Sequence, residues 1–122
     1  MVMMFSADKR NHKDPNTLML TQRIGTLKLE NLKKKDTIER IYIATKTVDE
    51  EGNEYVGEFL KKQPKLKDGV GRYFFVSGAK YEGQFTEGRI EGYGRKIYPN
   101  GEYYIGEFKD GKCEGQGKFQ DI

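Results

Sequence analysis

The sequence has little of what reaction centres usually need. Among 122 residues it has one cysteine, Cys113, one histidine, His12, and no tryptophan. A single thiol excludes an intrachain disulfide and suits a reducing compartment, so we expect a cytoplasmic protein. His12 lies in a polar stretch without a pattern of carboxylates or cysteines around it, whereas metal sites and catalytic triads need several converging groups. We therefore predict no metal site and a solvated His12.

Long apolar runs are also absent. No segment approaches the roughly 20 apolar residues that a membrane-spanning helix needs, and the first residues lack the basic and apolar regions of a signal peptide. The net charge of +3 comes from Lys, Arg, Asp and Glu mixed along the whole chain. Mixed charge predicts solubility and gives no basic stripe for a nucleic acid, so we expect no nucleic-acid partner.

Glycine is scarce in the first part and frequent in the second. Of the 15 glycines, only Gly25 precedes Gly52. This division predicts three parts: a flexible tail or partner-binding arm over 1–17, an N-terminal extended segment with a degenerate half-repeat over 18–51, and a repeat array over 52–122. In the middle part we favour extended structure from Leu18 to Leu32. A short helix capped by Asp36 competes with a strand from Arg40, which the β-branched residues favour.

An internal repeat is visible once two tyrosines 23 residues apart are superposed. The matched positions are Tyr81, Gly83, Phe85, Gly88, Glu91, Gly92 and Gly94, which fall on Tyr104, Gly106, Phe108, Gly111, Glu114, Gly115 and Gly117. An earlier copy starts at Tyr55 with Gly57 and Phe59. It is three residues longer, and the extra residues lie in the loop 61–68.

Each copy has the pattern of a β-hairpin. Alternation puts Tyr81, Gly83 and Phe85 on one face of a strand, with Glu82 and Gln84 on the other. The glycine leaves room for an aromatic ring over the bare backbone. Turns are predicted at 77–78, 87–88, 99–101 and 110–111, and Asn100-Gly101 is predicted as a two-residue turn with positive φ at both positions. The fold class is therefore all-β, an elongated single-layer antiparallel meander.

This pattern of Tyr-x-Gly-x-Phe, Gly, Gly-x-Gly and a turn glycine resembles the MORN repeat. The resemblance covers 52–122, with about three copies of which the last is truncated, and the first departs from it with Lys62 in place of the loop glycine. It implies a non-catalytic repeat used in assembly, since MORN proteins occur in cytoskeletal and ciliary structures, including axonemal radial spokes, and at membrane junctions.

No catalytic residue and no cofactor are predicted. The paired glycines near Gly69, Gly92 and Gly115 lead into no helix and lack the Lys-Ser/Thr of a phosphate loop. Glu91 and Glu114 recur once per repeat, which favours a structural role, and Cys113 lies in a turn without a general base.

Two sets of residues are candidate binding sites. A single-layer sheet cannot bury both faces by itself, so we expect the aromatic face either to pack on the N-terminal segment or to bind a partner. That face comprises Tyr55, Phe59, Tyr73, Tyr81, Phe85, Tyr98, Tyr104 and Phe108. The basic clusters, which could contact an anionic surface, comprise Lys33, Lys34, Lys35, Lys61, Lys62, Lys65 and Lys67.

The leading hypothesis is a scaffold subunit that binds other proteins of a multi-subunit cytoskeletal assembly, of the axonemal radial-spoke type. The first alternative is a peripheral membrane module that binds acidic phospholipid headgroups. The second is a regulatory fragment of a larger enzyme, because MORN arrays also precede catalytic domains in related families. Self-association through the strand edge near Phe119 is a further expectation.

Overall fold

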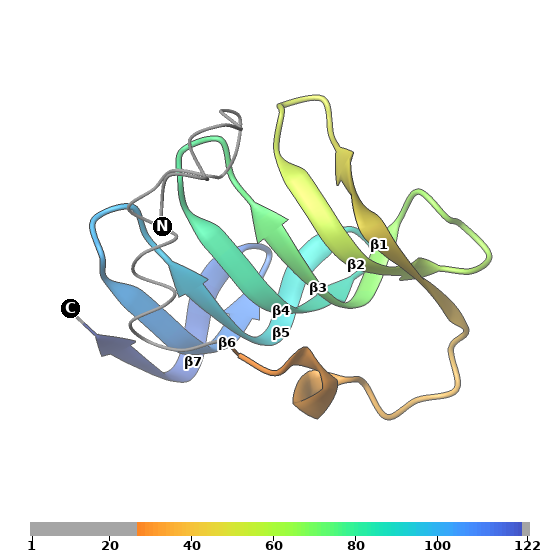
Figure 1. Cartoon of the computed structure of the whole chain (residues 1–122). Coiled ribbons are helices and arrows are strands. Elements are labelled where there is room, and N and C mark those ends of the chain that lie inside the picture. The colour runs from red at the N-terminus through yellow and green to blue at the C-terminus, as the bar shows by residue number, and fades with distance from the viewer. Residues whose placement is uncertain (1–26, 121–122) are drawn as a thin grey trace.

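The structure is a computed structural model, and it describes residues 27–120. In this part of the chain seven strands form one antiparallel sheet in chain order (Figure 1). The strands are β1 (Arg40–Val48), β2 (Glu54–Leu60), β3 (Lys67–Phe74), β4 (Lys80–Thr86), β5 (Arg89–Ile97), β6 (Tyr103–Lys109) and β7 (Lys112–Gln120). The predicted single-layer meander is confirmed.

The segment before β1 follows the prediction only in part. The strand from Arg40 is confirmed, and Asp36 caps no α-helix: it accepts a hydrogen bond from the Ile38 amide and pairs with Arg40 at 2.9 Å. The prediction of extended structure from Leu18 to Leu32 is wrong for the last four residues of that range, because Leu29–Leu32 form a 3-10 helix, η1. This segment crosses β3 and β4 instead of pairing with a strand, and side chains of those strands bind part of its backbone: Arg72 and Gln84 donate to the carbonyls of Leu27 and Leu32. Residues 1–26, with the predicted tail and His12, lie outside the described part.

Two kinds of turn alternate along the meander. Glu87-Gly88 and Asp110-Gly111 are two-residue turns with positive φ at both positions, as a type I′ hairpin requires. At the opposite end of the strands, Gly52, Gly78 and Gly101 each donate an amide hydrogen bond to the carbonyl three residues earlier.

The turn at 99–101 is where predicted, but its type differs. Glu87 and Asp110 are the only non-glycine residues with positive φ among residues 27–120, so Asn100 is not left-handed and only Gly101 is, at φ +99°. Pro99 explains the difference, because its fixed φ suits the first central position of a type I turn. The Asn100 side chain accepts a hydrogen bond from the Glu102 amide at 3.0 Å instead.

A β-bulge recurs where β2 pairs with β3, β4 with β5 and β6 with β7, and it explains the tyrosine of the motif. The register of β4 against β5 shifts between Gly83 and Phe85, and equivalent shifts follow Gly57 and Gly106. The Tyr81 hydroxyl donates to the carbonyl oxygen of Gln84, inside the bulge, at 2.9 Å. Tyr55 and Tyr104 make the same bond to Glu58 and Glu107 at 2.7 and 3.3 Å. The tyrosine therefore satisfies a carbonyl where the ladder is interrupted.

The side chain of the residue inside the bulge accepts a hydrogen bond from a backbone amide of the facing strand. The Gln84 side chain accepts a hydrogen bond from the Tyr93 amide at 2.8 Å, and Glu58 accepts one from Val70 at 2.9 Å. The repeat thus uses a Glu or Gln here to replace a missing ladder bond.

The glycines admit these side chains. A methyl group on Gly94 would overlap the ring and hydroxyl of Tyr81, and one on Gly83 would lie 2.5 Å from the Gly94 Cα. In the same way, the ring of Tyr55 lies over Gly71 and the ring of Tyr104 lies over Gly117. A ring does pack on bare backbone, but the prediction named the wrong glycine: the Tyr81 ring covers Gly94 of the adjacent strand, whereas Gly83, between the two rings of the motif, faces the backbone of Tyr93 and Gly94.

The aromatic rings also form a continuous core. Phe85 packs edge to face on Tyr55 and Tyr81, at ring-centroid distances of 5.0 and 5.3 Å. Phe108 does the same with Tyr81 and Tyr104, at 5.0 and 5.3 Å. Each phenylalanine thereby joins two hairpins, and such pairs stabilise beyond the area that they bury.

The opposite face has a buried charge cluster at its centre. Glu82 is fully buried, and its carboxylate lies 2.8 Å from Arg95, 3.1 Å from Arg72 and 3.2 Å from Lys80. Burial alone would raise the pKa of Glu82, but the neighbouring Lys80, Arg95 and Arg72 outweigh it and hold that pKa below its usual value. Arg72 also donates to the carbonyl of Leu27 at 3.0 Å, so the cluster anchors the segment before β1.

Replacing Gly94 with alanine should destabilise the fold by about 2–4 kcal/mol, because the Tyr81 ring cannot move away from the added methyl. Urea unfolding monitored by tyrosine fluorescence measures the change. The matched control is Gly111→Asn, since nothing lies within 4 Å of a Cβ there and asparagine tolerates its φ of +80°. Equal costs at the two positions would contradict the proposed role of the ring.

Replacing Glu82 with glutamine should cost about 3 kcal/mol near neutral pH, because three cations lose their buried counter-charge. A depressed carboxyl pKa contributes stability above the unfolded-state pKa, and that stability is lost as the pH falls through the folded-state pKa. The difference between the wild type and E82Q should therefore shrink progressively as the pH falls below the pKa of an unfolded glutamate, about 4.3. Urea titrations above and below this pKa test it, and a difference independent of pH would contradict it.

Candidate interaction surface

The aromatic face is the core of the sheet rather than an open surface. Six of its eight predicted residues are buried, namely Tyr55, Phe59, Tyr81, Phe85, Tyr104 and Phe108. Tyr73 and Tyr98 are half-buried and pack against this core. The bulged, twisted strands curl and the rings cover one another, so the sheet itself buries most of this face. Partner binding by this face stays a prediction that depends on its two half-buried tyrosines.

The segment before β1 packs on the polar face, not on the aromatic one. Arg72 and Gln84 donate to the carbonyls of Leu27 and Leu32, and Lys34 donates to Thr86 at 2.8 Å. We name residues 27–39 the strap. The alternation that separates Glu82 and Gln84 from the rings explains the outcome, because the polar face offers the donors and acceptors that the backbone of the strap requires.

A groove of about 880 Å³ runs over the aromatic face of the first hairpins. Its lining includes the aromatic residues Tyr55, Phe59 and Tyr73, together with Ile43 and Val48 of β1 and with Lys65 and Lys67. It leads into a smaller hollow of about 260 Å³ lined by Phe85 and Ile90. The Lys67 ammonium lies 5.5 and 5.2 Å above the rings of Tyr55 and Tyr73, within cation–π range.

An acidic edge borders the same groove. Asp49, Glu50 and Glu51 line it, and the Tyr73 hydroxyl donates a short hydrogen bond to Asp49. Burial acts to raise the pKa of Asp49, but hydrogen bonds from Tyr73 and from the amides of Asn53 and Glu51 outweigh this effect. The pKa of Asp49 is therefore below its usual value. Burial and the bond to Asp49 raise the pKa of Tyr73. The charge of the nearby Lys67 lowers the pKa of Asp49 as well, so the groove contains both acidic and basic side chains.

Sequence reasoning missed the acidic edge. The available signal was Gly52, which stands three residues before Tyr55 as Gly78 and Gly101 stand before Tyr81 and Tyr104. That spacing marks a turn of the same kind, so the acids before Gly52 had to lie at its tip.

The seven predicted lysines do not form one patch. Lys33 pairs with Glu58 at 3.3 Å, Lys34 approaches Asp68 at 3.9 Å, and Lys61 pairs with Glu39 at 3.7 Å. Lys67 lies in the groove. No ion pair is made by Lys35, Lys62 or Lys65 within residues 27–120, and these three are exposed.

Cys113 is exposed, and its sulfur lies 3.6 Å from the Tyr98 hydroxyl. Burial and this thiol raise the pKa of Tyr98 to about 12. Between residues 27 and 120 no cluster of His, Cys, Asp and Glu could hold a metal ion. In the same range no helix has the length and apolar character needed to cross a membrane.

The comparisons with known proteins agree with this geometry. The family model of the MORN repeat matches residues 81–103 and 104–121. No curated protein matches the chain. The matches begin at Tyr81 and Tyr104, two of the tyrosines that lie over a glycine. MORN repeats are typically non-catalytic modules with roles in protein interaction and membrane binding. Residues 81–121 are therefore similar to two MORN repeats.

Proposed function

We propose that the chain is a non-catalytic interaction subunit that binds a segment of a neighbouring protein in the groove over Tyr73. The observation that carries the proposal is a groove in which the half-buried ring of Tyr73 is accompanied by carboxylates and lysines of the lining. Aromatic residues are favoured at the centres of protein interfaces, and charged edges orient a partner.

The shape of the groove supports a polypeptide rather than a small molecule. Lys67, Tyr73 and Gly88 line both the main groove and its smaller continuation, so the hollow extends from one hairpin to the next. An amphipathic helix or an extended segment suits such an elongated site. The hairpin at Tyr55, which lines the groove, has the same ring-on-glycine contact as the two matched repeats, which supports counting it as a third.

We further propose that the neighbouring proteins belong to a cytoskeletal assembly of the ciliary, radial-spoke type. The resemblance to MORN repeats supports the assignment to a ciliary assembly. The groove supports only the binding of a protein segment, whatever the assembly. A fluorescent fusion that concentrates along the axoneme of ciliated cells would agree with it, while a uniformly cytoplasmic signal would contradict it.

A photo-crosslinking amino acid at Val48 should capture partner proteins, because this side chain is 58 % exposed and lines the groove. The matched control is Tyr42, which lies on the same strand with 59 % exposure but outside the lining. Immunoblots of irradiated cells should show discrete adducts for position 48 that Lys65→Glu reduces at least about fivefold. Adducts of equal yield at both positions, or none at either, would contradict the groove as the binding site.

Flotation with liposomes separates this proposal from acidic-lipid binding. Of the seven predicted lysines, only Lys35 and Lys62 are exposed, make no ion pair within residues 27–120 and lie outside the groove, so vesicles containing phosphatidylserine should not retain the protein at about 0.15 M salt. Retention that falls steeply with added salt would favour the membrane alternative. If the chain instead regulates an enzyme, a longer transcript should encode the catalytic domain.

A further inference from the structure

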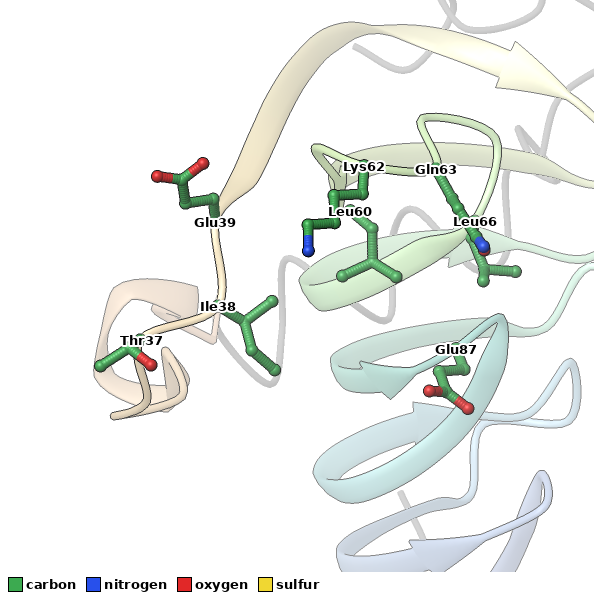
Figure 2. A pocket seen from close by; sticks show the side chains of 8 residues that line it. All are labelled: Thr37, Ile38, Glu39, Leu60, Lys62, Gln63, Leu66 and Glu87. Carbon is green, nitrogen blue, oxygen red and sulfur yellow. The ribbon is translucent and has the colours of Figure 1, made fainter.

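A second hollow lies outside the groove and shares none of its lining residues. It measures about 830 Å³ and lies between the strap and the loop that joins β2 to β3 (Figure 2). We name it the notch. Its lining residues are Thr37, Ile38, Glu39, Leu60, Lys62, Gln63, Leu66 and Glu87.

The notch exists because of the irregularity of the first hairpin. Turns 87–88 and 110–111 contain two residues, whereas the corresponding connection runs from Lys61 to Leu66. This longer loop projects beside the strap, and the Lys61 amide donates to the Glu39 carbonyl at 3.0 Å. The insertion thus creates a wall that the other two hairpins lack.

One buried carboxylate holds the walls together. Asp68, which is 3 % exposed, accepts a hydrogen bond at 3.0 Å from Arg40, the residue that follows the strap and begins β1. Its other oxygen accepts one from the Glu87 amide at 2.8 Å. Arg40 in turn binds Asp36 through two hydrogen bonds of 3.0 and 2.9 Å. Strap, loop and turn are therefore fixed before any partner arrives, which reduces the entropic cost of binding.

The chemistry of the notch is an apolar centre between two opposite charges. Ile38 is 51 % exposed, and its side chain points toward Leu60 across the gap (Figure 2). Lys61 pairs with Glu39, but neither Lys62 nor Glu87 makes an ion pair within residues 27–120. Lys62 comes from the loop and Glu87 from the next turn. An apolar site flanked by one free cation and one free anion selects the orientation of its ligand.

We propose that the notch binds a short amphipathic segment of another protein, with a large apolar side chain against Ile38, Leu60 and Leu66. An acidic residue of that segment pairs with Lys62 and a basic residue pairs with Glu87. An anionic bilayer is the poorer ligand, because the site is concave and carries the carboxylates of Glu39 and Glu87. A chain with this notch and the groove can join two different segments, as an assembly subunit requires.

Peptide display on the full-length protein tests the notch. Selected peptides should combine Leu, Ile, Met or Phe with one acidic and one basic residue, and their affinity is then measured by fluorescence anisotropy. Ile38→Glu should weaken binding at least about tenfold. Lys62→Glu should weaken it about fivefold, and exchanging the acidic residue of the peptide for lysine should restore it.

The matched control is Lys112→Glu, an exposed lysine beside the last two-residue turn, which should leave the affinity unchanged. Val48→Arg in the groove should also leave it unchanged, which separates a failure of the notch from a failure of the groove. Thermal unfolding verifies that each variant is folded. The proposal is overturned if no peptide is enriched, if binding survives Ile38→Glu, or if phosphatidylserine vesicles bind and lose binding with that variant.

Discussion

The packing of a tyrosine ring on the bare backbone of a glycine in the next strand is the contact on which this sheet depends. The ring of Tyr81 can reach the carbonyl of Gln84 only because Gly94 has no side chain. Its hydroxyl then satisfies the β-bulge, the bulge curls the strands, and the curvature lets each phenylalanine pack between two tyrosines. A single sheet thereby forms an aromatic core without a second layer packed against it.

The buried rings of the sheet and the residues at its margins therefore have different roles. The rings that satisfy bulges and fill the core are buried, so the binding that we propose involves residues at the margins of the curled sheet. Tyr73 and the acidic edge near Asp49 border the groove, and Ile38 and Lys62 border the notch. The buried cluster around Glu82 holds the strap on the opposite face, which leaves the groove uncovered by the strap.

Much of the fold could be predicted because the motif is local. Tyr-x-Gly-x-Phe and the turn glycines specify strands, faces and turn positions within a few residues of one another. The site could not be predicted as well, since its walls come from long-range contacts such as Arg40 with Asp68 and Lys61 with Glu39. The burial of Phe85 and Tyr104 was missed for the same reason, because alternation gives the face of a side chain but not the curvature of the sheet.

A double-mutant cycle of Tyr55→Ala and Gly71→Ala tests the central contact most directly, in the hairpin that the family model does not match. The account predicts that alanine at position 71 costs at least about 2 kcal/mol in the wild type and under about 1 kcal/mol once the Tyr55 ring is removed, as contacting residues show coupling of this size. Urea unfolding of the four proteins provides these free energies. Additive costs would show that the ring and the glycine act independently and would contradict the account.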